Sequence, residues 1–175
     1  MSADSLEFED ASFDVVSCAC LLMFRPEPAK TVAGARRVLK KGGRLAVVVW
    51  DAAEKNPFFT AVLEPVGRFV SLPRTDPKGP GNFRLAGDEL EKVVHAGGFE
   101  ELRVQTLPFE VIFESVEQHW EIFSEMAPPV KAARAALEPA DLARLKSAIG
   151  ESLRPYMAGD RVLLPATCVC ALATK

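Results

Sequence analysis

Two apolar stretches decide the fold of this chain: FDVVSCACLL at residues 13–22 and LAVVVW at residues 45–50. Neither alternates polar with apolar residues, as a strand with one exposed face does. Continuous runs of this kind are typical of strands that are buried on both faces of a parallel sheet. Between the two runs, Pro26 and Pro28 precede apolar residues at helical spacing, which predicts a helix. A strand, a helix and a second strand predict a right-handed parallel crossover and an α/β fold.

A pair of glycines, Gly42-Gly43, stands between this helix and the second strand. Such a pair fits either the C-terminal cap of a helix or a loop that binds phosphate. A phosphate-binding loop follows a strand and precedes a helix, whereas these glycines follow a helix and precede a strand. We therefore predict that Gly42-Gly43 ends the helix.

The middle of the chain continues the alternation of helix and strand. A helix is expected to begin at Asn56-Pro57, and residues 71–82, rich in proline and glycine, predict a surface loop. A further helix is expected to begin at Gly87-Asp88 and to stop at Gly97-Gly98, before a strand at residues 99–107. A helix again leads directly into a strand.

The last part of the chain is predicted to be mostly helical before a final strand. Ser115 and Gln118 fit a capping box for a helix that is broken by Pro128-Pro129. An amphipathic helix is expected to start near Asp141, and residues 166–173 predict the closing strand.

The composition is that of a globular protein and excludes some classes of partner. The 175 residues, 49% hydrophobic and 26% charged, suffice for one domain with a core. A net charge of −3 argues against a nucleic-acid partner, which requires clustered Lys and Arg, and favours a small ligand. The longest apolar stretch, residues 15–24, is about half of the roughly 18 residues that cross a bilayer, so no membrane partner is expected. The acidic N-terminus does not fit a secretory signal, so we expect a cytoplasmic protein.

The cysteines form two C-x-C pairs, Cys18 with Cys20 and Cys168 with Cys170. This spacing suggests a metal site, but zinc sites more often use C-x-x-C on turns. Residues i and i+2 of a strand share a face, so we interpret each pair as two small buried side chains and expect no metal. The two histidines belong to no recognisable triad and are interpreted as structural or surface groups.

Two longer motifs carry a resemblance to a known family. Residues 6–16 read LEFEDASFDVV, and residues 35–47, after Met23-Phe24-Arg25-Pro26, read ARRVLKKGGRLAV. They are similar to the LPFxDxSFDVV run and the RVLKPGGxLxV signature of class I S-adenosylmethionine-dependent methyltransferases. The similarity is greatest to the ubiquinone- and menaquinone-biosynthesis group (methyltransferase domain 11 type), and it extends to the final strand.

The resemblance implies a partial Rossmann-like methyltransferase sheet with helices on both faces. In the family the strand order is 3-2-1-4-5-7-6, with strand seven antiparallel. The strands predicted here would be equivalent to 4-5-7-6, and strands one to three have no counterpart. The chain would then be one truncated methyltransferase-like domain, residues 1–175, in which residues 110–160 form a helical insertion on the substrate side.

The resemblance also implies positions for S-adenosylmethionine and for the methyl acceptor. The family's Asp-Ala-Glu beside the adenine aligns with Ser2, Ala3 and Asp4. The residues implied to contact the cofactor are Ala3, Asp4, Ser5, Ser17, Cys18 and Ala19. The residues implied to contact a small-molecule acceptor are Met23, Phe24, Trp50, Phe83 and Trp120, each of which also fits ordinary core packing. No catalytic residue is implied, because transfer from a sulfonium is an in-line displacement that depends mainly on orientation.

The glycine-rich turn that holds the cofactor in this family has no counterpart in the 175 residues. The G-x-G at Gly79-Pro80-Gly81 lies in the proline-rich loop and is interpreted as a turn. Three interpretations therefore stay open. The chain is a methyltransferase that acts on a small molecule, or a non-catalytic module derived from that fold that dimerises or binds a ligand. The third is that it is part of a longer gene product in which Met1 is an internal start.

The strand at residues 13–22 would pair with strand one in the family. Without that strand, its edge and apolar side chains would be exposed, which is an aggregation hazard. We therefore predict a homodimer that forms through this edge.

Overall fold

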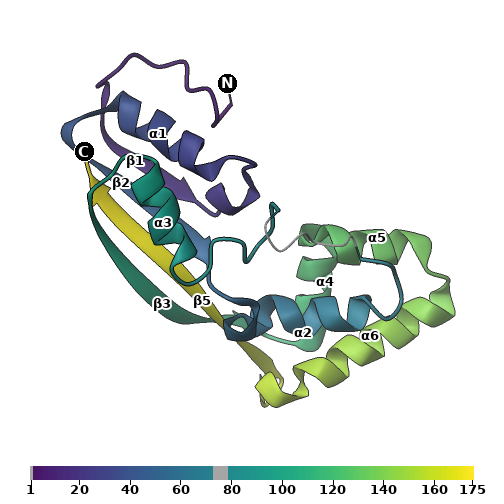
Figure 1. Cartoon of the computed structure of the whole chain (residues 1–175). Coiled ribbons are helices and arrows are strands. Elements are labelled where there is room, and N and C mark those ends of the chain that lie inside the picture. The colour runs from purple at the N-terminus through teal and green to yellow at the C-terminus, as the bar shows by residue number, and fades with distance from the viewer. Residues whose placement is uncertain (1, 73–78) are drawn as a thin grey trace. The chain divides into compact units, whose positions relative to one another are not determined.

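The computed structural model of the protein describes residues 2–72 and 79–175 (Figure 1). In these residues the strands of one sheet follow the order β1-β2-β5-β3. The strands β1 (Phe13–Ala19) and β2 (Leu39–Trp50) are parallel, and β5 (Arg161–Thr174) is antiparallel to β2. The predicted α/β sheet, with strands equivalent to 4-5-7-6 and an antiparallel last strand, is confirmed.

The remaining strands are β3 (Glu101–Phe113), beside β5, and the short β4 (Met157–Ala158), which pairs with the start of β5. β3 is longer than the predicted strand at residues 99–107, because it continues through Pro108. A proline lacks the N–H of a sheet ladder but is tolerated in a strand at the edge of a sheet, where β3 lies.

The chain divides into two compact units. The first unit contains residues 1–52, 75–108 and 167–175, and the second contains residues 53–74 and 109–166. Each unit is described separately below. The second unit includes the whole segment that the sequence predicts as a helical insertion.

The core of the first unit lies on one face of the sheet, beneath α1 (Pro28–Val38) and α3 (Glu89–Ala96), which lie side by side (Figure 1). Leu45, Val47 and Val49 of β2 point into this core, since alternate residues of a strand share a face. These side chains are at most 1% exposed. The packed layer therefore consists of α1 and α3 over the central strands.

Gly97, at the end of α3, allows these two helices to approach closely. A Cβ atom on Gly97 would lie 2.2 Å from Cγ1 of Val32 on α1, which is far inside van der Waals contact. The sequence predicted this glycine only as a helix stop. The structure shows that it is also a packing residue.

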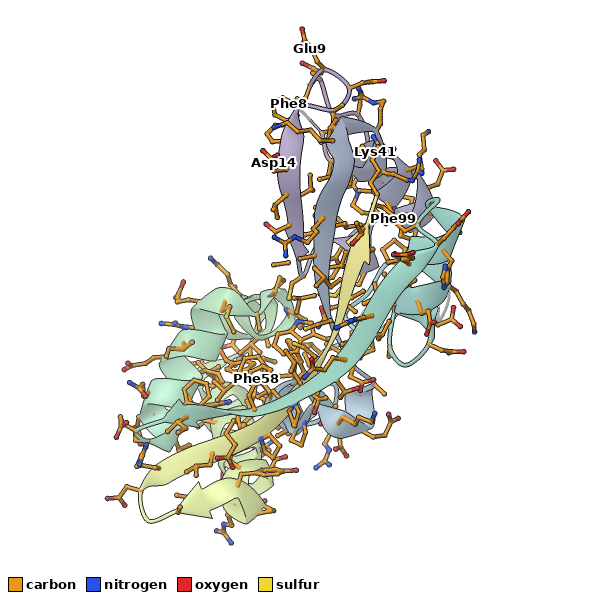
Figure 2. All side chains as sticks on the ribbon, turned by 90° about the vertical axis from the view of Figure 1, so that its left-hand side faces the viewer. Phe8, Glu9, Asp14, Lys41, Phe58 and Phe99 are labelled. Carbon is orange, nitrogen blue, oxygen red and sulfur yellow. The ribbon has the colours of Figure 1, made fainter. Side chains whose placement is uncertain are left out.

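The opposite face of the same strands is largely uncovered. Val15 on β1 is 53% exposed and Leu172 on β5 is 45% exposed, and Ser17 and Ala19 are exposed too. β1 is also the last strand on its side of the sheet, and Figure 2 shows it there with Asp14 along it. An apolar edge strand with an exposed face is a surface on which another segment can pair.

The prediction that Gly42-Gly43 ends the helix is wrong. α1 is followed directly by β2, and both glycines lie inside that strand. Phe13 pairs with Leu39 whereas Val15 pairs with Arg44, so β2 bulges between these two pairs. Gly42 has a φ of 76°, and a Cβ on Gly43 would lie 2.9 Å from a backbone oxygen. The glycines therefore allow the bulge rather than a helix cap.

The predicted strand at residues 13–22 is also shorter in the structure. β1 ends at Ala19, because Cys20 adopts a φ of 50° and turns the chain. A short 3₁₀ turn, Leu22–Phe24, follows before α1. The apolar side chains of Leu22 and Met23 are buried in the core of the first unit rather than in a strand.

The described residues of the second unit form four α-helices: α2 (Pro57–Val66), α4 (Val116–Met126), α5 (Pro128–Ala136) and α6 (Pro139–Leu153). The predicted helix starts at Asn56-Pro57 and after Ser115 are confirmed. The break at Pro128-Pro129 separates two helices, since Pro128 is the first residue of α5. Two 3₁₀ turns, Ala53–Lys55 and Arg154–Tyr156, β4, the end of β3 and the start of β5 also belong to this unit.

The capping box of α4 is confirmed in one of its two bonds. The hydroxyl of Ser115 accepts a hydrogen bond from the backbone N–H of Gln118 at 3.1 Å. The side chain of Gln118 accepts from the backbone N–H of Glu114, at 2.7 Å, rather than from that of Ser115. Both bonds satisfy donors at the start of the helix.

Of the predicted loop at residues 71–82, positions 73–78 lie outside the described residues. Among the residues that are described, no helix is long and apolar enough to span a membrane.

Candidate functional site

The carboxyl ends of β1 and β2 lie together at one edge of the sheet, because the two strands are parallel. Open α/β sheets bind ligands outside the carboxyl ends of their strands. Cys20 stands at this edge, where its backbone N–H donates to the carbonyl of Val48 at 2.8 Å. Its left-handed conformation costs about 1–3 kcal/mol for a residue with a side chain, and such strain gathers at ligand sites. We therefore take this edge as the candidate site.

Asp4 is held at this edge by two residues that follow β1. Its Oδ1 accepts hydrogen bonds from Nε of Arg25 at 2.9 Å and from the hydroxyl of Thr31 at 2.7 Å. Its Oδ2 forms an ion pair with the same guanidinium. A carboxylate offers about four lone-pair sites, and these interactions occupy three of them. One acceptor position therefore remains on the Asp4 side chain, which is 34% exposed.

The residues around Asp4 form a tight turn. The backbone N–H of Ser5 donates to the carbonyl of Ser2 at 3.1 Å, and the N–H of Asp4 donates to the Ser2 hydroxyl at 3.3 Å. Ala3 is half-buried and Ser5 is exposed. The serine that replaces the family's aspartate at position 2 therefore stabilises the turn that presents Asp4.

The three cofactor residues predicted on β1 do not share one surface. Cys18 packs against the core beneath α1 and α3, whereas Ser17 and Ala19 point to the uncovered face. Burial raises the pKa of the Cys18 thiol, an effect that the backbone N–H groups of Leu22 and Leu21 partly oppose. The structure thus brings Ser17 and Ala19 together and separates Cys18 from them.

The other three cysteines also stay protonated at neutral pH. Burial raises the pKa of Cys20 and Cys170, and burial together with neighbouring groups raises the pKa of Cys168 to about 11. A thiolate is the form that ligates metal or attacks an electrophile. Within the described residues, no group of three or more His, Cys, Asp or Glu side chains is arranged to hold a metal ion.

The predicted acceptor residues fall into three groups. Met23 is 1% exposed and belongs to the core, whereas Phe24, one residue later, is 45% exposed at the candidate site. Trp50, the last residue of β2, and Phe83 are half-buried and belong to the first unit. Trp120 lies on α4 of the second unit. Trp50 therefore ends β2 and Phe24 follows the neighbouring parallel strand β1, while Met23 has a structural role.

Asp51 is a residue of the site that the sequence analysis missed. It follows β2 directly and is 1% exposed. Its Oδ1 accepts from the backbone N–H of Ala52 at 2.8 Å and from that of Gly87 at 3.2 Å. A polar residue directly after a buried parallel strand was the available signal.

Arg84 is a second residue that was missed. Its guanidinium donates to the carbonyl of Arg25 and, at 3.2 Å, to the carbonyl of Pro26. The backbone N–H of Gly81 donates to the carbonyl of Met23 at 3.0 Å. These bonds tie residues 81–84 to the loop that follows β1, and the bond from Gly87 to Asp51 ties the same segment to the end of β2.

The two histidines occupy different environments. The Nδ1 of His95 lies 2.8 Å from the carbonyl of Phe99, so this ring has a structural partner in the first unit. His119, in the second unit, is fully buried, and neither ring nitrogen has a hydrogen-bond partner in the described structure. Its ring stacks on that of Phe123, with 4.5 Å between the ring centroids, and packs edge to face with Phe113, with 4.8 Å between the centroids. Burial lowers the pKa of His119 to about 4.

Comparison with known proteins supports the family resemblance. Residues 1–47 match the family model of the methyltransferase domain. A phosphatidylethanolamine N-methyltransferase from Cereibacter sphaeroides is 38% identical over 69 residues, which are 39% of this chain and 34% of that protein. The chain therefore spans about a third of the length of this curated relative.

Solved structures show the same fold. A candidate methyltransferase from Bacillus halodurans has a TM-score of 0.56 at 22% identity, over all of this chain and 75% of its own. The YcgJ protein from Bacillus subtilis has a TM-score of 0.51 at 18% identity, over all of this chain and 69% of its own. The resemblance to class I S-adenosylmethionine-dependent methyltransferases is confirmed, with the fold shared along the chain and the family sequence match confined to its first 47 residues.

The site fits one part of this family's cofactor and not the rest. Asp4 retains a free acceptor position that suits an exocyclic amine such as that of adenine. The glycine-rich turn is not among these residues, and Gly79 to Gly81 follow no described strand. Within residues 2–72 and 79–175, the structure therefore assembles no glycine-rich donor set for the methionine and ribose portions.

Proposed function

We propose that this chain supplies one part of an S-adenosylmethionine-dependent methyltransferase that acts on a small molecule. The observation that carries the proposal is the candidate site itself. Asp4, Arg25 and Thr31 build a clamp at the carboxyl edge of two parallel strands, within the segment that matches the methyltransferase family. A small ligand also agrees with the net charge of −3, which does not suit a polyanionic partner.

In this proposal the turn at Ala3, Asp4 and Ser5 lies beside the adenine, and the free acceptor position of Asp4 binds its amine. Ser17 and Ala19 line the path of the methionine portion, and Cys18 supports them from the core side. Arg25 is a positioning residue, because it acts through Asp4.

Phe24, Trp50 and Phe83, all in the first unit, would then form the apolar surface for the methyl acceptor. The name of the Cereibacter relative favours an amine as acceptor. The cofactor would supply a methyl group on a sulfonium, and the protein's task is to orient an unprotonated amine and to exclude water. Phe24 and Trp50 suit that task because they are large and apolar.

The incomplete donor set implies that another segment has to provide the glycine-rich turn. We propose that this segment pairs with the free edge of β1 and covers the part of the exposed face that carries Val15 and Leu172. It would either precede residue 1 in a longer polypeptide or belong to another chain. The exposed apolar face is the surface that such a layer would bury.

Calorimetric titration with S-adenosylhomocysteine tests both parts of the proposal. The chain alone should bind more weakly than about 1 mM, which corresponds to about −4 kcal/mol. A fusion that places the glycine-rich segment of a class I methyltransferase before residue 1 should bind at least about tenfold more tightly. The variant D4A of the fusion should lose most of this gain, whereas D10A, which removes an exposed carboxylate paired with Arg37, should keep it.

The outcomes separate the two parts. Tight binding by the chain alone would contradict the need for a further segment and would support the enzyme. Failure of a folded fusion to bind would contradict the methyltransferase proposal.

The exposed edge of β1 also favours the second candidate, a non-catalytic module that forms a homodimer. Two copies of β1 could pair edge to edge about a twofold axis and shield Val15. Light scattering should then give twice the 19.0 kDa mass of the chain, and V15E should restore the monomer. The control V104E alters an exposed valine on β3, at the other edge, and should leave the dimer intact. A monomeric wild-type chain at high concentration would exclude this candidate.

A further inference from the structure

A groove of about 440 Å³ lies on the second unit between α4, α5 and α6. Trp120 and Ile149, both buried, are part of its lining. Glu117 and Glu121 line it from α4, and Lys146 lines it from α6. A volume of this size lies in the range of about 300–1,000 Å³ that is usual for small-molecule sites.

The Trp120 ring already binds a cation in this groove. The Nζ of Lys146 lies 5.0 Å from the ring centroid, within the distance of about 6 Å at which a cation is attracted to an aromatic face. Lys146 is exposed and forms no ion pair in the described part of the chain. Its ammonium is therefore held by the ring alone and can leave for water at little cost.

Two carboxylates line the groove beside this ring. Glu117 and Glu121 are four residues apart on α4, which places them on the same side of the helix, with Trp120 between them. Neither forms an ion pair with a described residue, whereas Glu125, one turn further on, pairs with Arg134 at 3.2 Å. The groove thus combines an aromatic face with two unpaired carboxylates. Arg134, which also lines it, has its charge paired with Glu125.

We propose that this groove binds a small organic cation of the alkylammonium class. The head group of the ligand would take the place of the Lys146 ammonium on the Trp120 ring, and Glu117 and Glu121 would offset its charge. Aromatic faces bind such weakly hydrated cations better than they bind a strongly hydrated ammonium such as that of lysine. The site lies wholly in the second unit, and its occupancy does not depend on the proposed methyltransferase function.

Nuclear magnetic resonance of the full chain tests the proposal with tetramethylammonium chloride as the probe. The chain has two tryptophans, Trp50 and Trp120, so their indole N–H signals provide a site and an internal control. The Trp120 signal should shift with saturation at a dissociation constant on the order of 1–10 mM. The Trp50 signal should stay in place, and sodium chloride at equal concentration should have no effect on either. Equal shifts of both signals, or no saturable shift, would overturn the proposal.

Three variants sharpen this test. W120L should weaken binding about tenfold or more, and E117Q/E121Q should weaken it about threefold or more. K146M should tighten it about threefold, because the competing internal cation is gone. The matched control K30M removes an exposed lysine of the first unit and should change nothing. Weaker binding by K146M, or unchanged binding by E117Q/E121Q, would overturn the proposal. Positions 117, 121 and 146 are exposed, so these variants should fold and the test holds even if W120L does not fold.

Discussion

The two compact units of this chain bury their apolar side chains in different ways. In the second unit, side chains from four helices surround a common core, and even His119 is fully buried there (Figure 2 shows Phe58 of this core). In the first unit, α1 and α3 cover one face of the sheet, while Val15 and Leu172 on the opposite face are about half exposed. The second unit therefore has a core enclosed by its helices, while Ile112 and Met126 on its surface are about half exposed. The first presents an apolar surface that another layer of structure would cover.

The largest expected effect on stability comes from replacing a buried leucine of the sheet, and the same substitution on the opposite face provides the comparison. L45A removes a leucine that is 1% exposed on the covered face and should destabilise the protein by about 2–5 kcal/mol. L172A, on the open face, should cost less than about 1 kcal/mol, because that side chain is 45% exposed. Chemical denaturation measures both. Equal losses would show that the open face is buried in solution.

A pH dependence should arise from the closed core of the second unit. The pKa of His119 is lowered to about 4, so between pH 6.5 and pH 4 the unfolded chain binds a proton that the folded chain does not. The contribution of His119 to the free energy of unfolding should therefore be fully present above pH 6.5. The free energy of unfolding should fall by up to about 3 kcal/mol as the pH drops from 6.5 to 4.

H119F should remove this part of the pH dependence, because phenylalanine has no proton to bind. It should also stabilise the protein at pH 7, since it replaces a buried ring whose nitrogens have no partner. Denaturation curves of both proteins at pH 7 and pH 5 measure the difference. If the free energy of unfolding of H119F changed between pH 7 and pH 5 as much as that of the unmodified protein, His119 would be accessible to water.

The close contact of α1 and α3 gives a prediction of intermediate size. G97A should destabilise the first unit by about 1–3 kcal/mol, because its Cβ would overlap Val32. G34A, in the middle of α1, has no atom within 4 Å of the added Cβ and should stabilise the protein by about 0.5–1 kcal/mol. Thermal unfolding distinguishes the two signs. A neutral G97A would mean that the two helices are not packed as described.

The smallest expected effect concerns the Asp4 clamp. R25M should cost about 1 kcal/mol or less, since both partners of the ion pair are partly exposed. T31V should cost a similar amount through the lost hydrogen bond. Both variants should weaken cofactor binding in the fusion by more than they weaken folding. A loss of several kcal/mol in stability would assign the clamp to folding rather than to ligand binding.

Much of the first unit could be predicted from local sequence. The two continuous apolar runs predicted parallel strands because such runs have no polar face to expose. The glycine pair at Gly42-Gly43 was misinterpreted, since a helix cap and a strand bulge both use glycine. Only the register of β1 against β2, in which the partners of Phe13 and Val15 are five residues apart, distinguishes the two.

The local sequence pattern did not predict the features that depend on contacts between residues far apart in the chain. Arg25 and Arg84 act through partners that are 21 and 59 residues away in the sequence. The division into two units was hidden because β3 and β5 each contribute residues to both. The continuous apolar runs predicted burial on both faces, and the described residues leave one of them open.

A crystal structure of the fusion with a glycine-rich segment would test the central claim most directly. We expect a new strand that is parallel to β1, on the edge opposite β2, with helices over Val15 and Leu172. A structure in which that edge stays in solvent, or pairs only with a second copy of this chain, would contradict the proposal that β1 receives the nucleotide-binding part of a methyltransferase.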